Sequence, residues 1–237
     1  MEKNFSNILK HKIRVKFKHT LMVKDKKEIE KSVAQSLLRI KAVFLSPEKP
    51  FTWASGIKSP IYCDNRLILS DPAAREVVEN AIAATVEREF PGAEALMGTS
   101  TAGIAHAAIA AWILGKPMGY VRGSAKDHGR NNRIEGRLEP GAKVVVIEDL
   151  ISTAGSCIDV VEALREAGAE VHGVVSIFTY GMKKGLDRLE AAGVRNISLS
   201  NLDALLEVAV EENYVSADAK DAIKKFRDNP SDESWMK

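Results

Sequence analysis

The sequence predicts an α/β fold in which a mainly parallel sheet is covered by helices on both faces. Two observations favour this class. Short apolar runs of strand length alternate along the chain with longer segments of helical periodicity. The run 143–150 (KVVVIEDL) is apolar at successive positions, as expected of a strand buried on both faces. Strands that alternate with helices are typical of parallel sheets.

The N-terminal third of the chain predicts two helices separated by a region of turns. The first helix spans 25–42, where apolar side chains recur at near-helical spacing, at Ile29, Val33, Leu37, Leu38 and Ile40. Residues 51–66 contain Ser-Gly and Ser-Pro pairs, which indicate turns with short extended pieces. The second helix begins with Asp71 as N-cap and Pro72 as first helical residue, and it runs to about residue 90.

The rest of the chain predicts alternating strands and helices. The middle elements are a strand, a loop, a helix, a strand and a long polar stretch, over 93–98, 99–103, 104–114, 118–121 and 122–142. Gly115 and Pro117 end that helix, and Gly168 ends the next one. The later elements are a strand, a helix, a strand, a helix, a strand and two helices, over 143–150, 157–168, 171–178, 184–193, 195–200, 202–212 and 216–228.

Composition and cysteine content exclude several classes of protein. The 237 residues, 45% hydrophobic and 28% charged, are typical of a globular chain that forms one domain with a full core. No apolar run approaches the roughly 20 residues of a membrane helix, and the N-terminus lacks the apolar core of a secretory signal. Cys63 and Cys157 are too few for a disulfide framework or a cysteine-rich metal site. We therefore expect a cytoplasmic protein with no membrane partner.

Positive charge is concentrated at the N-terminus. Residues 1–21 carry six lysines and arginines against one glutamate, a net charge of +5, whereas the remainder has 28 basic and 31 acidic residues, a net charge of −3. A basic arm could contact nucleic acid or anionic lipid, or form an address signal. Short charged arms seldom fold alone, so we expect a disordered extension over 1–21 and no nucleic-acid partner.

The segment 144–156 (VVVIEDLISTAGS) combines features of two binding sites. Small hydroxyl residues and Gly155 precede a helix, so backbone N–H groups and the positive end of the helix dipole can bind a phosphate monoester. Glu148 and Asp149 would repel that phosphate unless they face a neutral, hydroxyl-rich part of the same ligand, or a divalent cation. A phosphorylated ribose meets both demands. Acidic pairs after parallel strands also occur in receiver domains and metal-dependent ATPases, and a Ser/Thr turn can simply cap a helix.

Two further loops are expected at the same edge of the sheet, where the carboxyl ends of parallel strands gather. The loop 122–134 is cationic and has two glycines, so it resembles either a solvated surface loop or a mobile clamp for a second, more highly charged anion. The small-residue loop 98–103 fits either an anion contact or plain packing.

Together these segments resemble a known family. VVVIEDLISTAGS is similar to the phosphoribosyl-pyrophosphate signature of type I phosphoribosyltransferases, and three further segments resemble orotate phosphoribosyltransferases in particular: FTWASGIKSPIYCDNR, YVRGSAKDHGRNNRIEG and IFTYG. The resemblance covers about residues 25–235. It implies a single domain over 22–237, with a hood over about 25–66, a core over about 71–200 and C-terminal helices over about 201–228. It also implies a flexible catalytic loop and a homodimer in which that loop crosses to the partner's site.

The resemblance implies roles for individual residues. Glu148 and Asp149 would bind the ribose hydroxyls, residues 152–156 the 5′-phosphate, and the cationic loop the pyrophosphate, with 99–103 alongside it. The implied phosphoribosyl-pyrophosphate residues are Arg122, Lys126, His128, Glu148, Asp149, Leu150, Ile151, Ser152, Thr153, Ala154, Gly155 and Ser156. The implied catalytic residues are Lys126, Asp149, Arg122 and His128. Mg²⁺ is the implied cofactor, held mainly by the substrate, with no direct protein ligand assigned.

Four positions depart from the family pattern, and each lacks a cation that some members carry: Ala54, Ala102, Gly123 and Tyr180. The residue that recognises the orotate carboxylate is therefore open. The candidates are hood backbone N–H groups together with a hydroxyl, from Ser55, Gly56, Ile57, Lys58 and Ser152.

The implied reaction transfers ribose 5-phosphate from phosphoribosyl pyrophosphate to orotate, in pyrimidine (UMP) biosynthesis. Its demanding step is the departure of pyrophosphate. A cation and a closing cationic loop would stabilise the charge that develops in this step. Ser152 replaces an aspartate of several purine enzymes, and orotate, already an anion, needs no strong base. A purine phosphoribosyltransferase and a non-catalytic sensor of phosphoribosyl pyrophosphate are the alternatives, although 21 residues cannot supply a DNA-binding domain for such a regulator.

Overall fold

A six-stranded sheet forms the centre of the computed structural model, which describes residues 25–53, 56–123 and 133–236. The strand order is β10-β9-β8-β5-β6-β7, and all neighbours are parallel except β7, which is antiparallel to β6. The strands are β5 (Ala95–Thr99), β6 (Met118–Val121), β7 (Ile134–Glu135), β8 (Lys143–Ile151), β9 (Glu170–Thr179) and β10 (Asn196–Asn201). The α/β class with a mainly parallel sheet is therefore confirmed.

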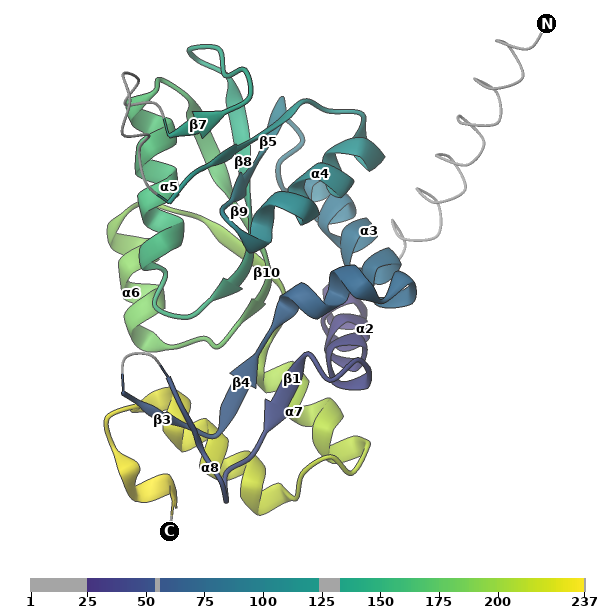
Figure 1. Cartoon of the computed structure of the whole chain (residues 1–237), viewed down its shortest axis with the longest axis vertical. Helices are drawn as coiled ribbons and strands as arrows, with labels where there is room; N and C mark the ends of the chain where they lie inside the picture. The colour runs from purple at the N-terminus through teal and green to yellow at the C-terminus, as the bar shows by residue number, and fades with distance from the viewer. Residues whose placement is uncertain (1–24, 54–55, 124–132, 237) are drawn as a thin grey trace, which may run out of the picture.

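Helices cover both faces of this sheet (Figure 1). One face packs against α2 (Lys26–Arg39), α3 (Pro72–Glu89) and α4 (Ala102–Leu114). The other face packs against α5 (Gly155–Glu166), and α6 (Lys183–Ala191) lies beside α5. Two hydrophobic clusters, one on each face, make up the core, because successive residues of a buried strand point to opposite sides.

A small lobe lies beside the sheet (Figure 1). It contains two antiparallel strand pairs, β1 (Val43–Leu45) with β4 (Ile61–Cys63) and β2 (Phe51–Thr52) with β3 (Lys58–Ser59). The 3₁₀ helix η1 (Asn65–Ser70) joins it to α3. The last elements are α7 (Leu202–Glu211), α8 (Ala217–Asp228) and the 3₁₀ helix η2 (Glu233–Met236).

Aromatic side chains pack this lobe against the C-terminal helices. Trp53 stacks on Tyr180 with ring centroids 5.6 Å apart, and its edge meets Phe226 at 5.7 Å. Phe226 in turn contacts Trp235 at 5.6 Å. The four rings therefore connect β2, the end of β9, α8 and η2 in one cluster.

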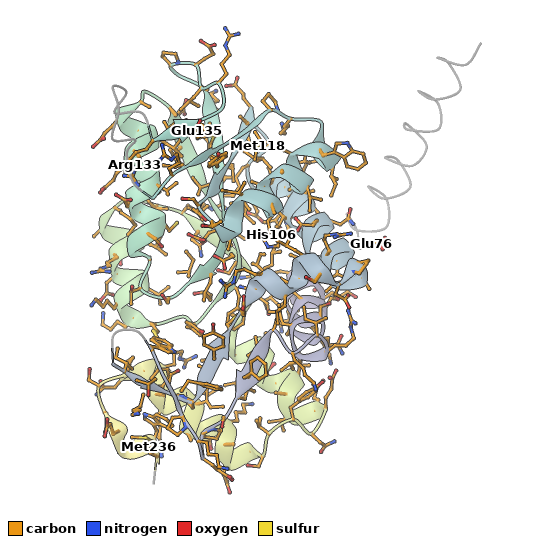
Figure 2. All side chains as sticks on the ribbon, viewed as in Figure 1. Glu76, His106, Met118, Arg133, Glu135 and Met236 are labelled. Atoms are coloured by element: carbon orange, nitrogen blue, oxygen red, sulfur yellow. The ribbon has the colours of Figure 1, made fainter. Side chains whose placement is uncertain are left out.

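A buried polar pair joins α3 to α4. His106 Nδ1 lies 2.5 Å from Glu79 Oε1, and both side chains are buried. Figure 2 labels His106, which lies on α4 in the interior of the molecule. Burial raises the pKa of Glu79, and the neighbouring His106 opposes that rise.

Among the described residues, no helix is long and apolar enough to cross a membrane.

Most expected elements are present, with differences at their ends. The predicted loop 99–103 is shorter, because β5 continues through Thr99 and α4 already begins at Ala102. Strand β8 extends to Ile151, so the acidic pair lies within the strand. Strands β1 and β7 were not expected, since two or three residues form a strand only where a partner strand pairs with them. The basic segment 1–21 lies outside the described residues.

Candidate active site

The acidic pair lies near the carboxyl end of β8, in the middle of the sheet. Successive residues of a strand face opposite sides, so the two carboxylates have different surroundings. Glu148 is buried, with 5% of its surface exposed, whereas Asp149 is half-buried and lines a cavity. The two carboxylates were expected to share one role, and in the structure their surroundings differ.

Glu148 is held by the core. Its Oε1 accepts hydrogen bonds from the Thr99 hydroxyl at 2.7 Å and from the backbone N–H of Asp149 at 2.9 Å. Burial, together with the adjacent Asp149 carboxylate, raises the pKa of Glu148 to about 8. This carboxyl therefore holds its proton more tightly than an exposed glutamate does.

The loop between β8 and α5 has the geometry of a phosphate site. Ala154 adopts the left-handed conformation (φ 59°) and turns the chain sharply into α5, which begins at Gly155. No side chain caps this helix, so the N–H groups of its first turn are open to a ligand. The predicted phosphate-binding residues Ser152 to Ser156 thus lie together at the end of β8.

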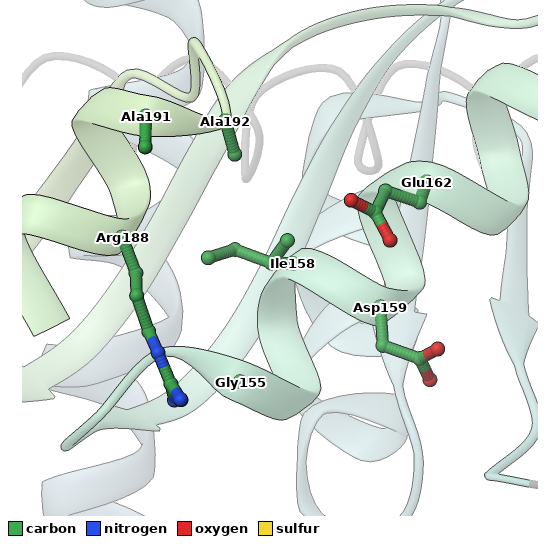
Figure 3. A pocket seen from close by; sticks show the side chains of 7 residues that line it. All are labelled: Gly155, Ile158, Asp159, Glu162, Arg188, Ala191 and Ala192. Carbon is green, nitrogen blue, oxygen red and sulfur yellow. The ribbon is translucent and has the colours of Figure 1, made fainter.

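Helix α6 supports this loop from behind. Arg188 Nη1 donates to the carbonyl oxygen of Thr153 at 3.1 Å. A Cβ atom on Gly185 would meet the Ser152 carbonyl oxygen well inside van der Waals contact, so the two backbones touch. Figure 3 shows Arg188 extending from α6 toward Gly155.

Figure 3 also shows a hollow between α5 and α6. This cavity of about 430 Å³ is lined by Gly155, Ile158, Asp159, Glu162, Arg188, Ala191 and Ala192. Two of its lining side chains are acidic, and of the predicted site residues only Gly155 borders it. It borders the loop between β8 and α5 through Gly155.

A second cavity, of about 290 Å³, contains the acidic end of β8. Its lining residues are Cys63, Asp64, Arg66, Thr101, Ala102 and Asp149. They come from three places: the end of β4 with η1, the start of α4, and β8. At Gly103 a Cβ atom would lie 2.5 Å from the Ile147 carbonyl oxygen, so the first turn of α4 packs directly on β8.

The sequence interpretation did not single out Asp64 or Arg66, although both belong to a segment used for the family resemblance. Arg66 Nε and Nη2 donate to Asp64 Oδ1 at 2.6 Å and to Oδ2 at 2.8 Å. This pairing holds the pKa of Asp64 below its usual range. Arg66 is the only cation among the described residues that line the cavity.

A buried amide connects the small lobe to the acidic strand. Asn65 Nδ2 donates to the backbone carbonyl of Asp149 at 2.7 Å, and the Cys63 thiol donates to Asn65 Oδ1 at 3.3 Å. Asn65 is 1% exposed. The position of the lobe relative to Asp149 is therefore fixed by a hydrogen bond between residues 84 positions apart.

The predicted base-binding segment forms a hairpin. The backbone N–H of Gly56 donates to the Trp53 carbonyl at 2.8 Å, so this group is occupied within the turn. The Ile57 carbonyl accepts from the N–H of Trp53 at 2.9 Å, and Lys58 Nζ donates to the Thr52 hydroxyl at 2.7 Å. Ala54 and Ser55 lie outside the described residues.

Tyr180 does not replace the missing arginine as a cation. Its side chain is 3% exposed and packs beneath Trp53. Burial raises the pKa of Tyr180 well above its ordinary value, so the phenol is neutral at physiological pH. At this position the chain has an aromatic packing residue.

The cationic loop is described only at its ends. Arg122 follows β6, and its N–H donates to the Arg133 carbonyl at 2.8 Å. Arg133 pairs with Asp159 on α5, at 3.1 and 2.5 Å, which holds the C-terminal end of the loop against that helix. Lys126 and His128 lie outside the described residues, so their predicted roles stay predictions.

The described residues contain no group of three or more His, Cys, Asp or Glu side chains that could hold a metal ion by themselves. Asp64 and Asp149, however, line one cavity, and carboxylate oxygens are the ligands that Mg²⁺ prefers. Since Asp64 is paired with Arg66, Asp149 is the better placed of the two. The residues therefore fit an ion that a bound ligand holds and one carboxylate supports.

Comparison with known proteins agrees with this geometry. Residues 67–209 match the family described as Phosphoribosyl transferase domain. Orotate phosphoribosyltransferase of Listeria monocytogenes serotype 4b (strain F2365) is 54% identical over 209 residues, 88% of this chain and 99% of that protein. The enzyme of the same name from Bacillus cereus (strain G9842) is 52% identical over 208 residues, again 88% and 99%.

Solved structures agree as well. The crystal structure of orotate phosphoribosyltransferase from Aeropyrum pernix aligns with a TM-score of 0.68 at 30% identity, covering 78% of this chain and 99% of that one. The chain thus shares its overall fold with a solved orotate phosphoribosyltransferase. The chain belongs to the phosphoribosyl transferase family, and its relatives along nearly their whole length are orotate phosphoribosyltransferases.

Proposed function

We propose that the protein is an orotate phosphoribosyltransferase, which transfers ribose 5-phosphate from phosphoribosyl pyrophosphate to orotate and releases orotidine 5′-phosphate and pyrophosphate in pyrimidine biosynthesis. The observation that carries the proposal is the β8–α5 junction. There an open helix N-terminus and the Asp149 carboxylate lie at the end of one strand, as a phosphorylated ribose requires. The relatives at 52–54% sequence identity indicate that the base is orotate.

The described residues orient the sugar from both ends. Residues 152–156 bind the 5′-phosphate through backbone N–H groups, and Asp149 accepts hydrogen bonds from the ribose hydroxyls. Glu148, fixed by Thr99, lies directly behind it. Anchoring both ends of the sugar holds its anomeric carbon in place, which lowers the entropic cost of bringing orotate to it.

The site must also stabilise the charge that develops as the substrate reacts. As the bond to pyrophosphate breaks, negative charge develops on the leaving group and positive charge on the sugar. Mg²⁺, when bound with the substrate, supplies compensating positive charge next to Asp149. The loop residues Arg122, Lys126 and His128 add further cations and exclude water as they close. Orotate is already an anion, so the chain needs no strong base at Ser152.

We also propose a cytoplasmic homodimer in which Lys126 acts in the partner's site. The family resemblance of the segment 120–136 supports the shared site, and the two buried free thiols, Cys63 and Cys157, suit a reducing compartment.

The proposal is tested by offering orotate, adenine, guanine and xanthine in parallel to the purified protein with Mg²⁺ and phosphoribosyl pyrophosphate. We expect orotate absorbance to decrease and orotidine 5′-phosphate and pyrophosphate to form in equal amounts. The matched control is Asp149→Asn, which should form neither product. Turnover of a purine, with orotate left unchanged, would reject the assignment in favour of a purine enzyme. Tight binding of phosphoribosyl pyrophosphate without turnover of any base would favour the non-catalytic sensor.

A further inference from the structure

We propose that Arg66 binds the pyrophosphate group of the substrate, and so supplies in the described part of the site a cation to which the sequence analysis gave no role. This inference rests on the proposed function for the identity of the substrate. Arg66 lines the same cavity of about 290 Å³ as Asp149.

The strand order predicts where the 5′-phosphate, the sugar and the pyrophosphate of the substrate lie. Strand β8 lies between β9 and β5, α5 follows β8, and α4 follows β5. Phosphoribosyl pyrophosphate has its sugar between its two phosphorylated ends. With the 5′-phosphate at the start of α5 and the sugar at Asp149, the pyrophosphate extends toward the start of α4.

Two walls of the cavity suit an anion at that position. Thr101 and Ala102 form one wall, at the start of a helix of 13 residues that no side chain caps. Arg66 lies on another wall, from η1. Without Arg66, the charged side chains of this lining would be Asp64 and Asp149 alone, and both would repel pyrophosphate.

The Arg66 guanidinium is oriented in advance and still has donors to offer. Asp64 accepts from Nε and from one N–H of Nη2, and Asp64 itself accepts from the Arg66 backbone N–H at 3.2 Å. A guanidinium has five N–H donors in a fixed plane, so three are not used by this pair. The side chain is 64% exposed, which leaves those donors accessible to a ligand oxygen.

A matched control is available in the same chain. Arg39 pairs with Asp71 in the same two-point manner, at 3.3 and 2.9 Å, and its side chain is 53% exposed. It joins α2 to the start of α3 and lines neither described cavity. Arg39→Ala therefore removes a similar exposed ion pair without touching the site.

The experiment measures Mg²⁺-pyrophosphate binding by calorimetry, together with KM values in both directions, for wild type, Arg66→Ala, Arg66→Lys and Arg39→Ala. For Arg66→Ala we expect the pyrophosphate Kd and the KM for phosphoribosyl pyrophosphate to rise about tenfold or more, since a charge-assisted hydrogen bond is lost. The KM for orotate and the Kd for orotidine 5′-phosphate should change less than twofold. Arg66→Lys should recover part of the loss, and Arg39→Ala should match wild type.

Unchanged pyrophosphate binding in Arg66→Ala would overturn the inference. So would a selective loss of orotate binding, which would place Arg66 at the base. A folding defect in Arg66→Ala is identified by thermal unfolding, and Arg66→Lys then decides, because it keeps the charge but not the planar donor pattern. If no base is turned over and pyrophosphate still binds more weakly to Arg66→Ala, the proposed function fails and the Arg66 site stands.

Discussion

Replacing Gly185 with alanine tests whether α6 positions the β8–α5 loop, for which we propose phosphate binding. Gly185 lies in the first turn of α6, and its backbone touches the Ser152 carbonyl. Real Cβ atoms essentially never lie closer than 3.0 Å to another heavy atom, and a Cβ here would be about half an ångström inside that limit. The atom it meets belongs to the backbone, so no side chain can rotate away. Either α6 or the loop has to move.

The size of the effect follows from that displacement. A shift of roughly half to one ångström in a substrate-positioning loop reduces activity by about 10- to 100-fold. Overpacking lowers the free energy of unfolding by about 1–3 kcal/mol, and the better helix propensity of alanine returns about 0.5–1 kcal/mol. The net loss corresponds to a fall in Tm of a few degrees for a domain of this size.

The assay is steady-state kinetics with phosphoribosyl pyrophosphate as the varied substrate, together with thermal unfolding. We expect Gly185→Ala to raise the KM for phosphoribosyl pyrophosphate at least tenfold. The control is Gly92→Ala, where a Cβ would lie 3.6 Å from His172 Cε1, an ordinary contact, so kinetics and Tm should stay within error of wild type. A Gly185→Ala protein with wild-type KM and Tm would refute the view that α6 supports the loop.

Three further predictions concern the carboxylates and the cationic loop. Asp149→Asn should lower kcat at least 100-fold with little change in Tm, since this carboxylate faces the ligand cavity; unchanged kinetics would remove it from the ribose site. The raised pKa of Glu148 means that the folded state binds a proton more tightly than the unfolded state. Wild type should therefore lose stability, by a few kcal/mol at most, relative to Glu148→Gln as pH rises from about 4.5 to about 8, and urea unfolding at pH 5 and 8 measures this difference. Lys126→Ala and Asp149→Asn, refolded together, should regain about a quarter of wild-type activity if the loop acts across a twofold dimer; a mixture that stays inactive although mixed dimers are present would reject the shared site.

The main fold could be predicted from local signals. Asp71 and Pro72 mark the start of α3, and the apolar run before Glu148 marks the central strand. These signals act over a few residues and hardly depend on the rest of the chain. The small lobe could not be predicted in the same way, because β1 pairs with a strand about 18 residues away and three residues carry too little pattern to identify it.

The candidate site was predictable in part. The segment 152–156 lies where its sequence indicates, at the start of a helix that follows a parallel strand. The different surroundings of Glu148 and Asp149 follow from strand alternation, but the side that is buried depends on Thr99, about 50 residues earlier. Arg66 belongs to the site only because Asn65 holds η1 against β8, a contact that no local pattern reveals.

The aromatic cluster gives the protein an internal optical probe. The chain has three tryptophans. Trp112 is 77% exposed and Trp235 is buried among the C-terminal helices, whereas Trp53 lies on the hairpin of β2 and β3 with its indole against Tyr180. Any movement of that hairpin changes the stacking and therefore the emission of Trp53. With Trp112 replaced by phenylalanine, the fluorescence of the unlabelled protein should report whether this hairpin moves when a substrate is added.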